Sequence, residues 1–464
     1  MAAKTIAAIS TPPGKGGVAV IRISGDDAFT IARSVFRPRS AKAKESFPKR
    51  VPVWGDILHT GEPIDDGLLT FFPAPNSYTG EDMAEISCHG GTLITSKVLE
   101  AVLIAGASAA ERGEFTRRAF LSGKLTLTEA EAIGLVLDAR SEAQIRLSRA
   151  ESRGRLASEI DAIRSSITSL LSSLYARIDY PEEDLGDFTD DETVAQLDAL
   201  ILRSEALIST YKTGHAVSEG IRTVICGKPN VGKSTLYNLL LLEDAAIVTD
   251  VPGTTRDVLE SSVALGDVML KISDTAGIRG GELDMVERIG ISRSVERIEN
   301  AELIIALFDS SRKPDDEDIR IVDLLRGANV PSLAVITKTD SDRYSDEIKE
   351  MLCGTVNDGI LEISAQARGD EARACLVDAV EGLFKDEKIS IGDDAIISSA
   401  RQNAALVRAC NHLKTAKDAF SLGISTDAAS SDIELSLGAI AEIDGRAVSE
   451  EVVADIFAKF CVGK

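Results

Sequence analysis

One short segment constrains the fold of this chain more than any other. Gly227–Ser234 reads Gly-Lys-Pro-Asn-Val-Gly-Lys-Ser and matches the pattern G-x-x-x-x-G-K-[S/T]. An apolar run, Thr223–Cys226, precedes it and a helical segment, Thr235–Leu242, follows it. In this order of strand, glycine-rich loop and helix, backbone N–H groups of the loop can close around phosphates. The segment therefore predicts a nucleotide-binding P-loop domain.

The residues around this loop alternate between strand-like and helical patterns. The apolar runs between residues 218 and 383 are Thr223–Cys226, Val268–Ile272, Leu303–Phe308, Ser332–Ile336 and Ile360–Ile363. Strands that alternate with helices indicate a mostly parallel sheet covered on both faces. We therefore assign residues 218–383 to the P-loop domain.

The flanking regions have different patterns. Residues 1–118 mix short apolar runs with Gly/Pro turns and predict a small α/β domain with some antiparallel pairing. Residues 119–217 are helical, and apolar residues at spacings of three and four over 156–178 form one stripe of a long helix that should end near Pro181. Residues 384–464 are helical again. We expect this tail to complete the bundle, so that the P-loop domain is an insertion within it.

The composition limits the functions that the chain can serve. Its 464 residues carry a formal net charge of −23, whereas a protein that grips nucleic acid unaided needs a basic surface. A local patch or a basic partner must therefore hold any RNA. The six cysteines form no C-x-x-C pair, and the sequence shows neither a secretory signal nor an apolar stretch of membrane-spanning length. We expect a cytoplasmic protein without disulfides, a zinc site or a membrane span.

Two further segments lie where a nucleotide site needs them. Lys233 should reach the β and γ phosphates, and Ser234 should ligate Mg²⁺. Asp274–Gly277 follows the next strong strand, where a carboxylate can hold the magnesium shell and a glycine N–H can sense the γ-phosphate. Thr254–Asp257 falls between the two, as a switch loop should, and Thr255 is the expected second magnesium hydroxyl.

The segment Thr337–Asp340 predicts the choice of base. The Asp340 carboxylate can accept hydrogen bonds from the N1–H and the exocyclic amine of guanine. Thr337 stands where the usual motif has Asn, so we expect a weaker contact to the purine and to the P-loop. Ser364–Gln366 fits a loop whose backbone contacts the guanine oxygen, with Gln366 in place of a Lys or Arg. GTP is the expected nucleotide, and ATP is the alternative.

Hydrolysis also needs a group that orients the attacking water. Many small G proteins use a glutamine directly after the glycine that corresponds to Gly277, but Ile278 stands here. Another side chain must therefore position the water, and another charge must neutralise the transition state.

Longer stretches of the sequence resemble one family, the bacterial tRNA-modification GTPases called MnmE or TrmE. The resemblance covers nearly all of the chain in the family's order, and the C-terminal Cys461–Lys464, Cys-Val-Gly-Lys, is its most specific part. The other matching segments are Thr11–Gly17, Pro75–Asp82, Gly113–Thr116, Arg118–Leu121, Asp179–Glu183 and Thr249–Asp257. Arg112 departs from the family, which usually has Pro before Gly-Glu-Phe. The resemblance implies that residues 1–118 form a dimerisation domain of the tetrahydrofolate-binding type.

The resemblance implies that potassium activates the GTPase. In the family, a P-loop asparagine side chain and switch-loop oxygens hold K⁺ against the phosphates, where other GTPases use an arginine finger. The matching positions are Asn230, Thr249, Val251 and Thr254. The family's water-orienting glutamate matches Glu287, which follows a loop one residue longer than usual. Glu287 is thus the expected catalytic residue, and a solvated carboxylate at a helix start is the alternative.

These motifs together define the predicted nucleotide site. Ser234 and Thr255 are its Mg²⁺ ligands. The expected GTP-binding residues are Asn230, Val231, Gly232, Lys233, Ser234, Thr235, Thr249, Asp250, Val251, Pro252, Gly253, Thr254, Thr255, Asp274, Thr275, Ala276, Gly277, Thr337, Lys338, Asp340, Ser364, Ala365 and Gln366.

The family also binds a reduced folate, 5,10-methylene- or 5-formyl-tetrahydrofolate, in the N-terminal domain near the C-terminus of the partner subunit. The matching positions are Arg22, Glu85, Lys124 and Lys464. A glutamate can pair with the N–H groups of a pterin, and lysine or arginine suits the carboxylates of folate. Ordinary surface charge is the alternative for Arg22 and Lys124. Cys461 is either a nucleophile or a buried small hydrophobe.

The resemblance further implies a homodimer joined through the N-terminal domains, in which GTP and K⁺ bring the two P-loop domains together. It implies a flavin-dependent partner, MnmG, and the addition of an aminomethyl or carboxymethylaminomethyl group to C5 of the wobble uridine of certain tRNAs. The acidic net charge fits a division of labour in which the partner carries most of the tRNA-binding surface. The alternatives are a ribosome-assembly or signalling switch that shares only the P-loop domain, and a family member that has lost the folate chemistry.

Overall fold

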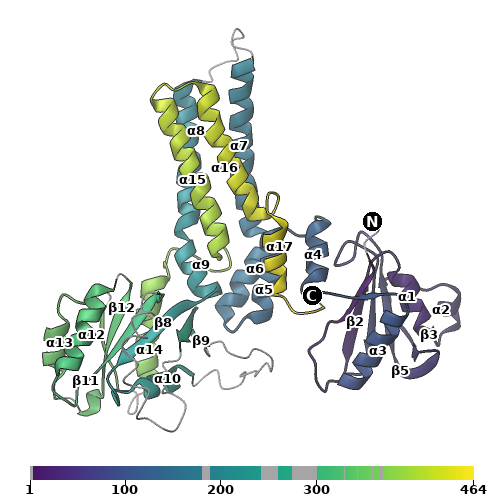
Figure 1. Cartoon of the computed structure of the whole chain (residues 1–464), viewed down its shortest axis with the longest axis horizontal. Helices are drawn as coiled ribbons and strands as arrows, with labels where there is room; N and C mark the ends of the chain where they lie inside the picture. The colour runs from purple at the N-terminus through teal and green to yellow at the C-terminus, as the bar shows by residue number, and fades with distance from the viewer. Residues whose placement is uncertain are drawn as a thin grey trace. The chain divides into compact units, whose positions relative to one another are not determined.

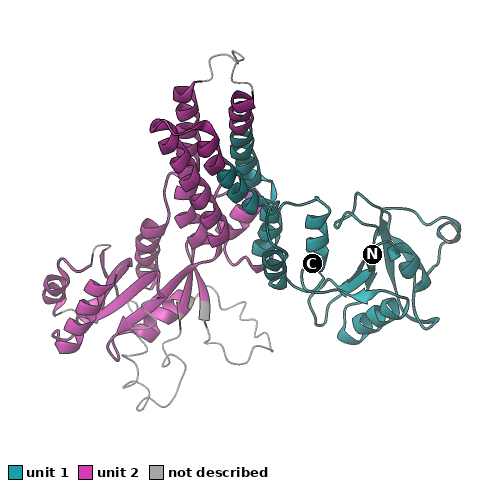
Figure 2. Ribbon diagram, turned by 45° about the horizontal axis from the view of Figure 1, so that its top comes forward, with its two compact units in different colours: residues 1–137, 151–168, 434–464 teal, residues 138–150, 169–433 magenta. Residues whose placement is uncertain are grey.

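The computed structural model describes residues 4–179, 189–241, 260–273, 300–328, 330–341, 343–356, 359–364 and 369–463. The chain, drawn in Figure 1, divides into two compact units, which Figure 2 shows in different colours. Unit 1 comprises residues 1–137, 151–168 and 434–464, and unit 2 comprises residues 138–150 and 169–433. A search of the helices in the described stretches finds none with the length and apolar character that a membrane span requires.

Unit 1 is built on a seven-stranded sheet with the strand order β3-β4-β5-β6-β2-β1-β7. Neighbouring strands are antiparallel except β1 and β7, which are parallel. The strands are β1 (Ile6–Ile9), β2 (Ala19–Ser24), β3 (Phe36–Pro38), β4 (Val53–His59), β5 (Glu62–Phe72), β6 (Met83–Cys88) and β7 (Ser108–Ala109). The predicted N-terminal α/β fold with antiparallel pairing is confirmed.

Helices α1 and α3 cover one face of this sheet. Ile21 and Ile23 of β2 are buried in the core beneath them, whereas Arg22 between them is only partly buried. Successive side chains of a strand point to opposite faces, so Arg22 lies on the face that α1 and α3 leave uncovered. The helices of this unit are α1 (Ala28–Ser34), α2 (Ala41–Glu45), α3 (Thr92–Ile104), α4 (Glu114–Leu121), α5 (Leu127–Asp138) and α17 (Glu450–Ala458), together with parts of α7 (Arg155–Asp179) and α16 (Thr426–Asp444).

The C-terminal helix α17 belongs to unit 1 and packs on α5. Val453, Phe457 and Phe460 form a buried cluster with Leu127 and Ala130. This packing brings the last residues of the chain to the N-terminal sheet, where Arg22 lies.

Unit 2 contains a six-stranded sheet with the order β13-β12-β11-β8-β10-β9. Every neighbouring pair is parallel except β10 and β9. The strands are β8 (Ile221–Gly227), β9 (Glu260–Leu265), β10 (Val268–Ser273), β11 (Leu303–Asp309), β12 (Ser332–Thr337) and β13 (Ile360–Glu362). All five predicted strands are present. The antiparallel edge strand β9 was not predicted.

Helices cover both faces of the six-stranded sheet, as the sequence predicts for a P-loop domain. One core joins the strands to α10 and α14, and the other joins them to α12 and α13. The central strand β11 is buried along its whole length, which is typical of a parallel strand covered on both sides. The helices are α10 (Lys233–Leu241), α12 (Asp316–Gly327), α13 (Ser345–Leu352) and α14 (Gly369–Phe384).

The helical segments before and after this sheet pack together, so the predicted insertion of the P-loop domain is confirmed. Helix α8 (Asp190–Ser209) precedes the sheet, and α15 (Ala400–Ser421) follows it and lies along α8 in Figure 1. Two ion pairs join them, Lys414–Glu205 at 2.7 Å and Lys417–Asp198 at 2.6 Å. The other helices are α6 (Glu142–Ser152), α7 (Arg155–Asp179), α9 (Tyr211–Ser218) and α16 (Thr426–Asp444).

Candidate functional site

The P-loop joins the end of β8 to the start of α10, in the middle of the sheet. Three of its residues, Gly227, Asn230 and Gly232, have positive φ angles of 150°, 62° and 112°. A Cβ at Gly227 would lie 2.9 Å from the carbonyl oxygen of Leu307 on β11, closer than real Cβ atoms approach. Only glycine therefore fits at position 227. Asparagine is one of the few residues with a side chain that adopts the left-handed backbone conformation found at Asn230.

The polar groups of the loop are placed to meet an anion. Lys233 extends its ammonium group into the loop and donates to the carbonyl oxygens of Gly227 at 2.6 Å and Lys228 at 3.0 Å. Asn230 and Ser234 are exposed, and Ser234 lies in the first turn of α10. The positive end of a helix dipole and the Lys233 ammonium both favour negative charge at this point.

Thr337 connects the predicted base-binding turn to the P-loop. Its hydroxyl lies 2.6 Å from the carbonyl oxygen of Val231 and 3.1 Å from that of Phe308, and donates to these acceptors. Thr337 therefore contacts the P-loop directly, and the expectation that this contact is weaker than that of an asparagine stays a prediction. Its contact to the purine stays a prediction.

Asp340 lies in the short 3₁₀ turn η2 (Thr339–Ser341) that follows β12. Ser364, just beyond β13, donates a hydrogen bond of 2.9 Å to the Asp340 carboxylate. This bond, with a longer one of 3.3 Å from Ser341, lowers the pKa of Asp340. Two predicted segments therefore meet at an ionised acceptor, which is the form that can bind the N–H groups of guanine.

The structure adds a residue that the sequence reasoning missed. Asp309, the last residue of β11, is almost fully buried and accepts a 2.6 Å hydrogen bond from the Lys338 ammonium. Burial alone would raise the pKa of Asp309, but bonds from Lys338, Ser311 and Arg312 lower it to about 2. A usable signal was present in the sequence, because Asp309 directly follows the predicted strand Leu303–Phe308, at the sheet edge where the P-loop also begins.

Some predicted site residues lie outside the described residues. They include the switch segments, the candidate catalytic glutamate and the terminal lysine. They are Thr249, Asp250, Val251, Pro252, Gly253, Thr254, Thr255, Asp274, Thr275, Ala276, Gly277, Glu287, Ala365, Gln366 and Lys464.

In unit 1 the structure brings together two of the predicted folate residues. Arg22 and Glu85 face each other on β2 and β6, and both Nε and Nη2 of Arg22 bond to Glu85 Oε1, at 3.0 and 2.9 Å. Nη1 of Arg22 lies 3.4 Å from the carbonyl oxygen of Gly463, which also accepts a bond from Ser10. Arg22 thus contacts the C-terminal segment of its own chain, whereas the resemblance implies the C-terminus of a partner subunit.

Two aromatic rings lie beside Arg22, and Lys124 bonds to the segment that carries one of them. The Arg22 guanidinium lies over the rings of Tyr78, at 5.2 Å, and Phe115, at 5.8 Å. Lys124 donates to the carbonyl oxygens of Pro75 at 3.1 Å and of Ser77. The segment that resembles the family at Pro75–Asp82 thus lies beside Arg22 and is also bonded to Lys124.

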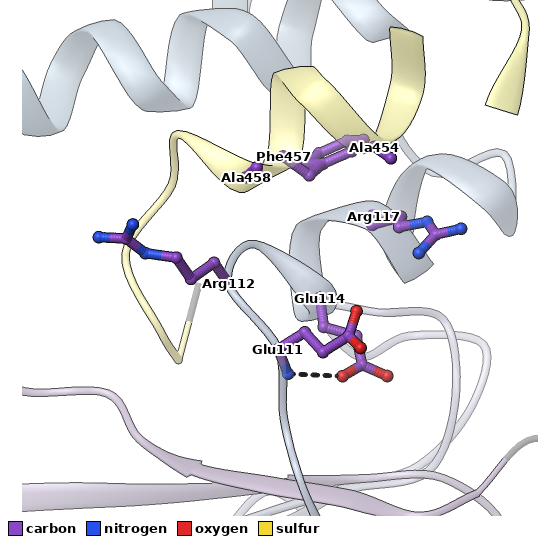
Figure 3. A pocket seen from close by; sticks show the side chains of 7 residues that line it. All are labelled: Glu111, Arg112, Glu114, Arg117, Ala454, Phe457 and Ala458. Atoms are coloured by element: carbon purple, nitrogen blue, oxygen red, sulfur yellow. Dashed lines mark hydrogen bonds between the residues drawn. The ribbon is translucent and has the colours of Figure 1, made fainter. Parts of the chain in front are cut away.

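Arg112, the residue that departs from the family, lines a cavity of about 290 Å³ between α4 and α17 (Figure 3). Its backbone pairs with that of Val462, and Gly113 donates to the carbonyl oxygen of Cys461 at 3.3 Å. In Figure 3, Arg112 and Arg117 lie on opposite sides of Glu111 and Glu114, with Ala454, Phe457 and Ala458 along the other wall. Cys461 is exposed, so its interpretation as a buried hydrophobe is wrong.

Comparisons with known proteins agree with these arrangements. Residues 5–124 match the family described as GTP-binding protein TrmE N-terminus, and residues 127–461 match the MnmE helical domain. The tRNA modification GTPase MnmE of Thermotoga maritima is 38% identical over 464 residues, which cover 99% of this chain and all of that protein. The MnmE proteins of Clostridioides difficile and of a Thermoanaerobacter species are also 38% identical, with 99% of both chains covered.

The full-length match excludes one of the alternatives that the sequence left open. A ribosome-assembly or signalling switch would share only the P-loop domain with these relatives, whereas here the N-terminal sheet and the helices on both sides of the insertion match as well. The nucleotide motifs, the two-sided parallel sheet and this coverage lead to one assignment. The chain belongs to the MnmE family of tRNA modification GTPases, enzymes that hydrolyse GTP.

Proposed function

We propose that this chain is a potassium-dependent GTPase that modifies the wobble uridine of certain tRNAs together with a flavin-dependent MnmG partner and a folate one-carbon unit. The observation that carries the nucleotide part is the geometry of Gly227–Ser234, where three positive φ angles, the Lys233 ammonium and the start of α10 converge. Asp340, held by Ser364, would select guanine.

The residues of the loop suit the two cations. Mg²⁺ and K⁺ both take oxygen ligands, and the exposed Ser234 hydroxyl and Asn230 amide offer them. Ser234 and Thr255 would hold Mg²⁺, and Asn230, Thr249, Val251 and Thr254 would hold K⁺. The cations would neutralise charge that develops on the phosphates, while Glu287 would orient the attacking water.

The N-terminal sheet supports the folate part of the proposal. Arg22, Glu85 and Lys124 would bind 5,10-methylene- or 5-formyl-tetrahydrofolate, and Lys464 would join them from the C-terminus. Arg22 and Lys124 supply positive charge for the folate carboxylates, and the rings of Tyr78 and Phe115 give Arg22 a flat, partly apolar surrounding.

We also propose the working assembly. The chain would comprise four segments, residues 1–118, 119–217, 218–383 and 384–464. It would form a homodimer through its N-terminal domains and act in the cytoplasm. The six free cysteines are compatible with that reducing compartment. MnmG would supply most of the contacts to tRNA, because this chain carries a net charge of −23.

Turnover of GTP in KCl and in NaCl tests the potassium claim. We expect much faster turnover in KCl, and Asn230→Ala should remove the difference because it deletes the amide ligand. Equal rates of the wild-type protein in the two salts would refute potassium dependence. Glu287→Ala should lower turnover and leave GTP affinity nearly intact; a large loss of affinity would assign Glu287 a structural role.

Two measurements test the tRNA and folate claims separately. Nucleoside mass spectrometry of tRNA from cells that lack this gene should show wobble uridines without the C5 group. Binding of 5-formyltetrahydrofolate should weaken when the chain ends at Gly463, because the terminal lysine is lost. Unchanged binding by the truncated chain would count against Lys464.

A further inference from the structure

One acidic segment contacts both nucleotide motifs of unit 2. It runs from Asp309, at the end of β11, to Asp318, in the first turn of α12, and is called here the acidic brace. Its carboxylates face two lysines: Lys338, in the base-binding turn, and Lys228, in the P-loop. Neither the sequence motifs nor the proposed function gives this segment a role.

At its first residue the acidic brace fixes the Lys338 side chain. The Lys338 ammonium lies 2.6 Å from Asp309 Oδ2, and the Asp309 side chain is 1% exposed. The two carboxylate oxygens accept further bonds from the Ser311 backbone and hydroxyl and from Arg312 Nε. With four donors around it, the carboxylate stays ionised and holds one position, so the Lys338 ammonium is held as well.

The next residue, Ser310, fixes the backbone of the same turn. Its N–H and hydroxyl both donate to the carbonyl oxygen of Thr337, at 3.1 and 2.9 Å. Its own carbonyl oxygen accepts bonds of 3.0 Å from Arg343 and Tyr344. The turn that carries Asp340 is therefore held at its start, at its end and through Lys338, whose φ of 60° is a conformation that needs such support.

At its other end the acidic brace holds the P-loop. The buried Lys228 ammonium lies 2.8 Å from Asp315 Oδ2 and 2.6 Å from Asp318 Oδ2. Burial alone would lower the pKa of Lys228, but the hydrogen bonds to the two carboxylates raise it. The carbonyl oxygen of Lys228 in turn accepts a bond from the Lys233 ammonium.

We propose that the acidic brace positions the two nucleotide motifs, with Asp309 acting through Lys338 on base recognition and Asp318 acting through Lys228 on phosphate binding. Asp309 is thus a specificity-determining positioning residue and not a nucleotide ligand. The inference rests on the proposed nucleotide site, because it assigns guanine recognition to Asp340. The proposal predicts that the two ends of the acidic brace affect different parts of the nucleotide, the base and the phosphates.

Two nucleotides separate a positioning role from a purely structural one. GDP and IDP differ only in the exocyclic amine of the base, which Asp340 would recognise. In Asp309→Asn a neutral amide replaces the carboxylate that holds the Lys338 ammonium. The turn that carries Asp340 is then no longer held in one position. We expect about tenfold weaker GDP binding and about a threefold smaller preference for GDP over IDP.

Asp318→Asn is the matched control, since it also neutralises a buried carboxylate paired with a lysine. It should weaken GDP and IDP equally, because both carry the same diphosphate. Calorimetric titration of the full-length variants with both nucleotides, together with thermal unfolding, measures the two effects. If Asp309→Asn does not fold, Lys338→Met replaces it; it keeps the stem, removes the ammonium and should lower the GDP/IDP preference by the same factor.

An unchanged GDP/IDP preference in Asp309→Asn, or in Lys338→Met where that variant is used, would overturn the positioning role, even if both nucleotides bind more weakly. Such a result would leave the proposed function standing, provided that the wild-type protein still prefers GDP to ADP. If the wild-type protein showed no such preference, the guanine site and the inference built on it would both be wrong.

Discussion

The six-stranded sheet of unit 2 and the seven-stranded sheet of unit 1 form their candidate sites in different ways. In unit 2, the residues predicted to bind the nucleotide lie in short loops that follow parallel strands. Within one loop they are close together in the sequence, as in Gly227–Ser234 and Thr337–Asp340. In unit 1, Arg22 meets Gly463, 441 positions away. A sequence motif describes the first kind of site, whereas packing of α17 creates the second.

The positively charged side chains of the two sites also have different partners. In the P-loop, Lys228 is neutralised by Asp315 and Asp318, while Lys233 bonds to backbone carbonyl oxygens. In unit 1, Arg22 shares its charge with Glu85. The Lys233 ammonium lies within the P-loop beside the start of α10, where an anionic ligand is favoured, so we expect the P-loop to be the more sensitive site to loss of a single cation.

Lys233→Ala tests that difference and should have the largest effect. Removing the ammonium from the phosphate site should lower GTP turnover by about 100-fold or more, a typical cost for one group that stabilises transition-state charge. Steady-state hydrolysis measures it. Binding of 5-formyltetrahydrofolate by the same variant is the control and should not change. Turnover within threefold of the wild type would show that the P-loop does not depend on this charge.

The contrast explains what the sequence could predict. The P-loop, all five predicted strands and the long helix α7 follow from local patterns. Strand β9 was missed because its sequence, Glu-Ser-Ser-Val-Ala-Leu, is polar in its first half, so its apolar pattern is short. The pairing of Asp309 with Lys338 across 29 positions requires knowledge of which strands are neighbours.

The site in unit 1 was reached through family resemblance alone. Nothing in the pattern around Arg22 indicates Glu85, Tyr78 or the C-terminus as neighbours, because these contacts depend on the order of strands and on the docking of α17. A contact of Thr337 with the P-loop was expected from its motif, but its acceptor, the carbonyl oxygen of Val231, depends on how the end of β12 lies beside the loop.

Gly113→Ala tests whether the docking of α17 creates the second site. Gly113 has a φ of 65°, and an added Cβ would lie 2.5 Å from the carbonyl oxygen of Phe457. Gly123 has a similar φ of 73° but no atom within 4 Å of an added Cβ, so Gly123→Ala is the matched control. We expect losses of about 3 and about 1 kcal/mol in the free energy of unfolding, respectively. Equal losses in denaturant titrations would show that the close approach of α17 contributes nothing.

Arg22→Ala should have a smaller effect, confined to the site in unit 1. Binding of 5-formyltetrahydrofolate should weaken by about tenfold, because a charge-assisted hydrogen bond to a folate carboxylate is lost. Arg39→Ala is the control: Arg39 also pairs with a carboxylate and lies over an aromatic ring in the same unit, but at the exposed edge beside Trp54. GTP turnover should be unchanged in both variants. If the two substitutions weakened folate binding equally, the cause would be a general effect of charge.

The smallest predicted effect concerns His215, which joins α9 to the sheet of unit 2. Its ring lies 3.4 Å from Glu219 and 3.1 Å from Glu302, and the Glu219 carboxylate is the main cause of its raised pKa. A histidine whose pKa is raised by folding stabilises the folded state fully below its unfolded pKa of about 6.5, and this contribution is lost as the pH rises through the folded value. Glu219, whose own pKa is lowered by His215, stays ionised over that range.

The contribution is therefore testable by comparing wild type with His215→Gln in denaturant titrations from pH 5.5 to 8.5. The wild type should be more stable by at most about 1 kcal/mol at the acid end, and the difference should shrink toward the alkaline end. No equivalent trend is expected for Arg39→Ala, because that substitution leaves His215 and its two carboxylate partners in place. A difference that grows with pH would mean that folding lowers the pKa of His215, so that burial of the imidazolium outweighs its two carboxylate partners, and these ion pairs would not help to join α9 to the sheet.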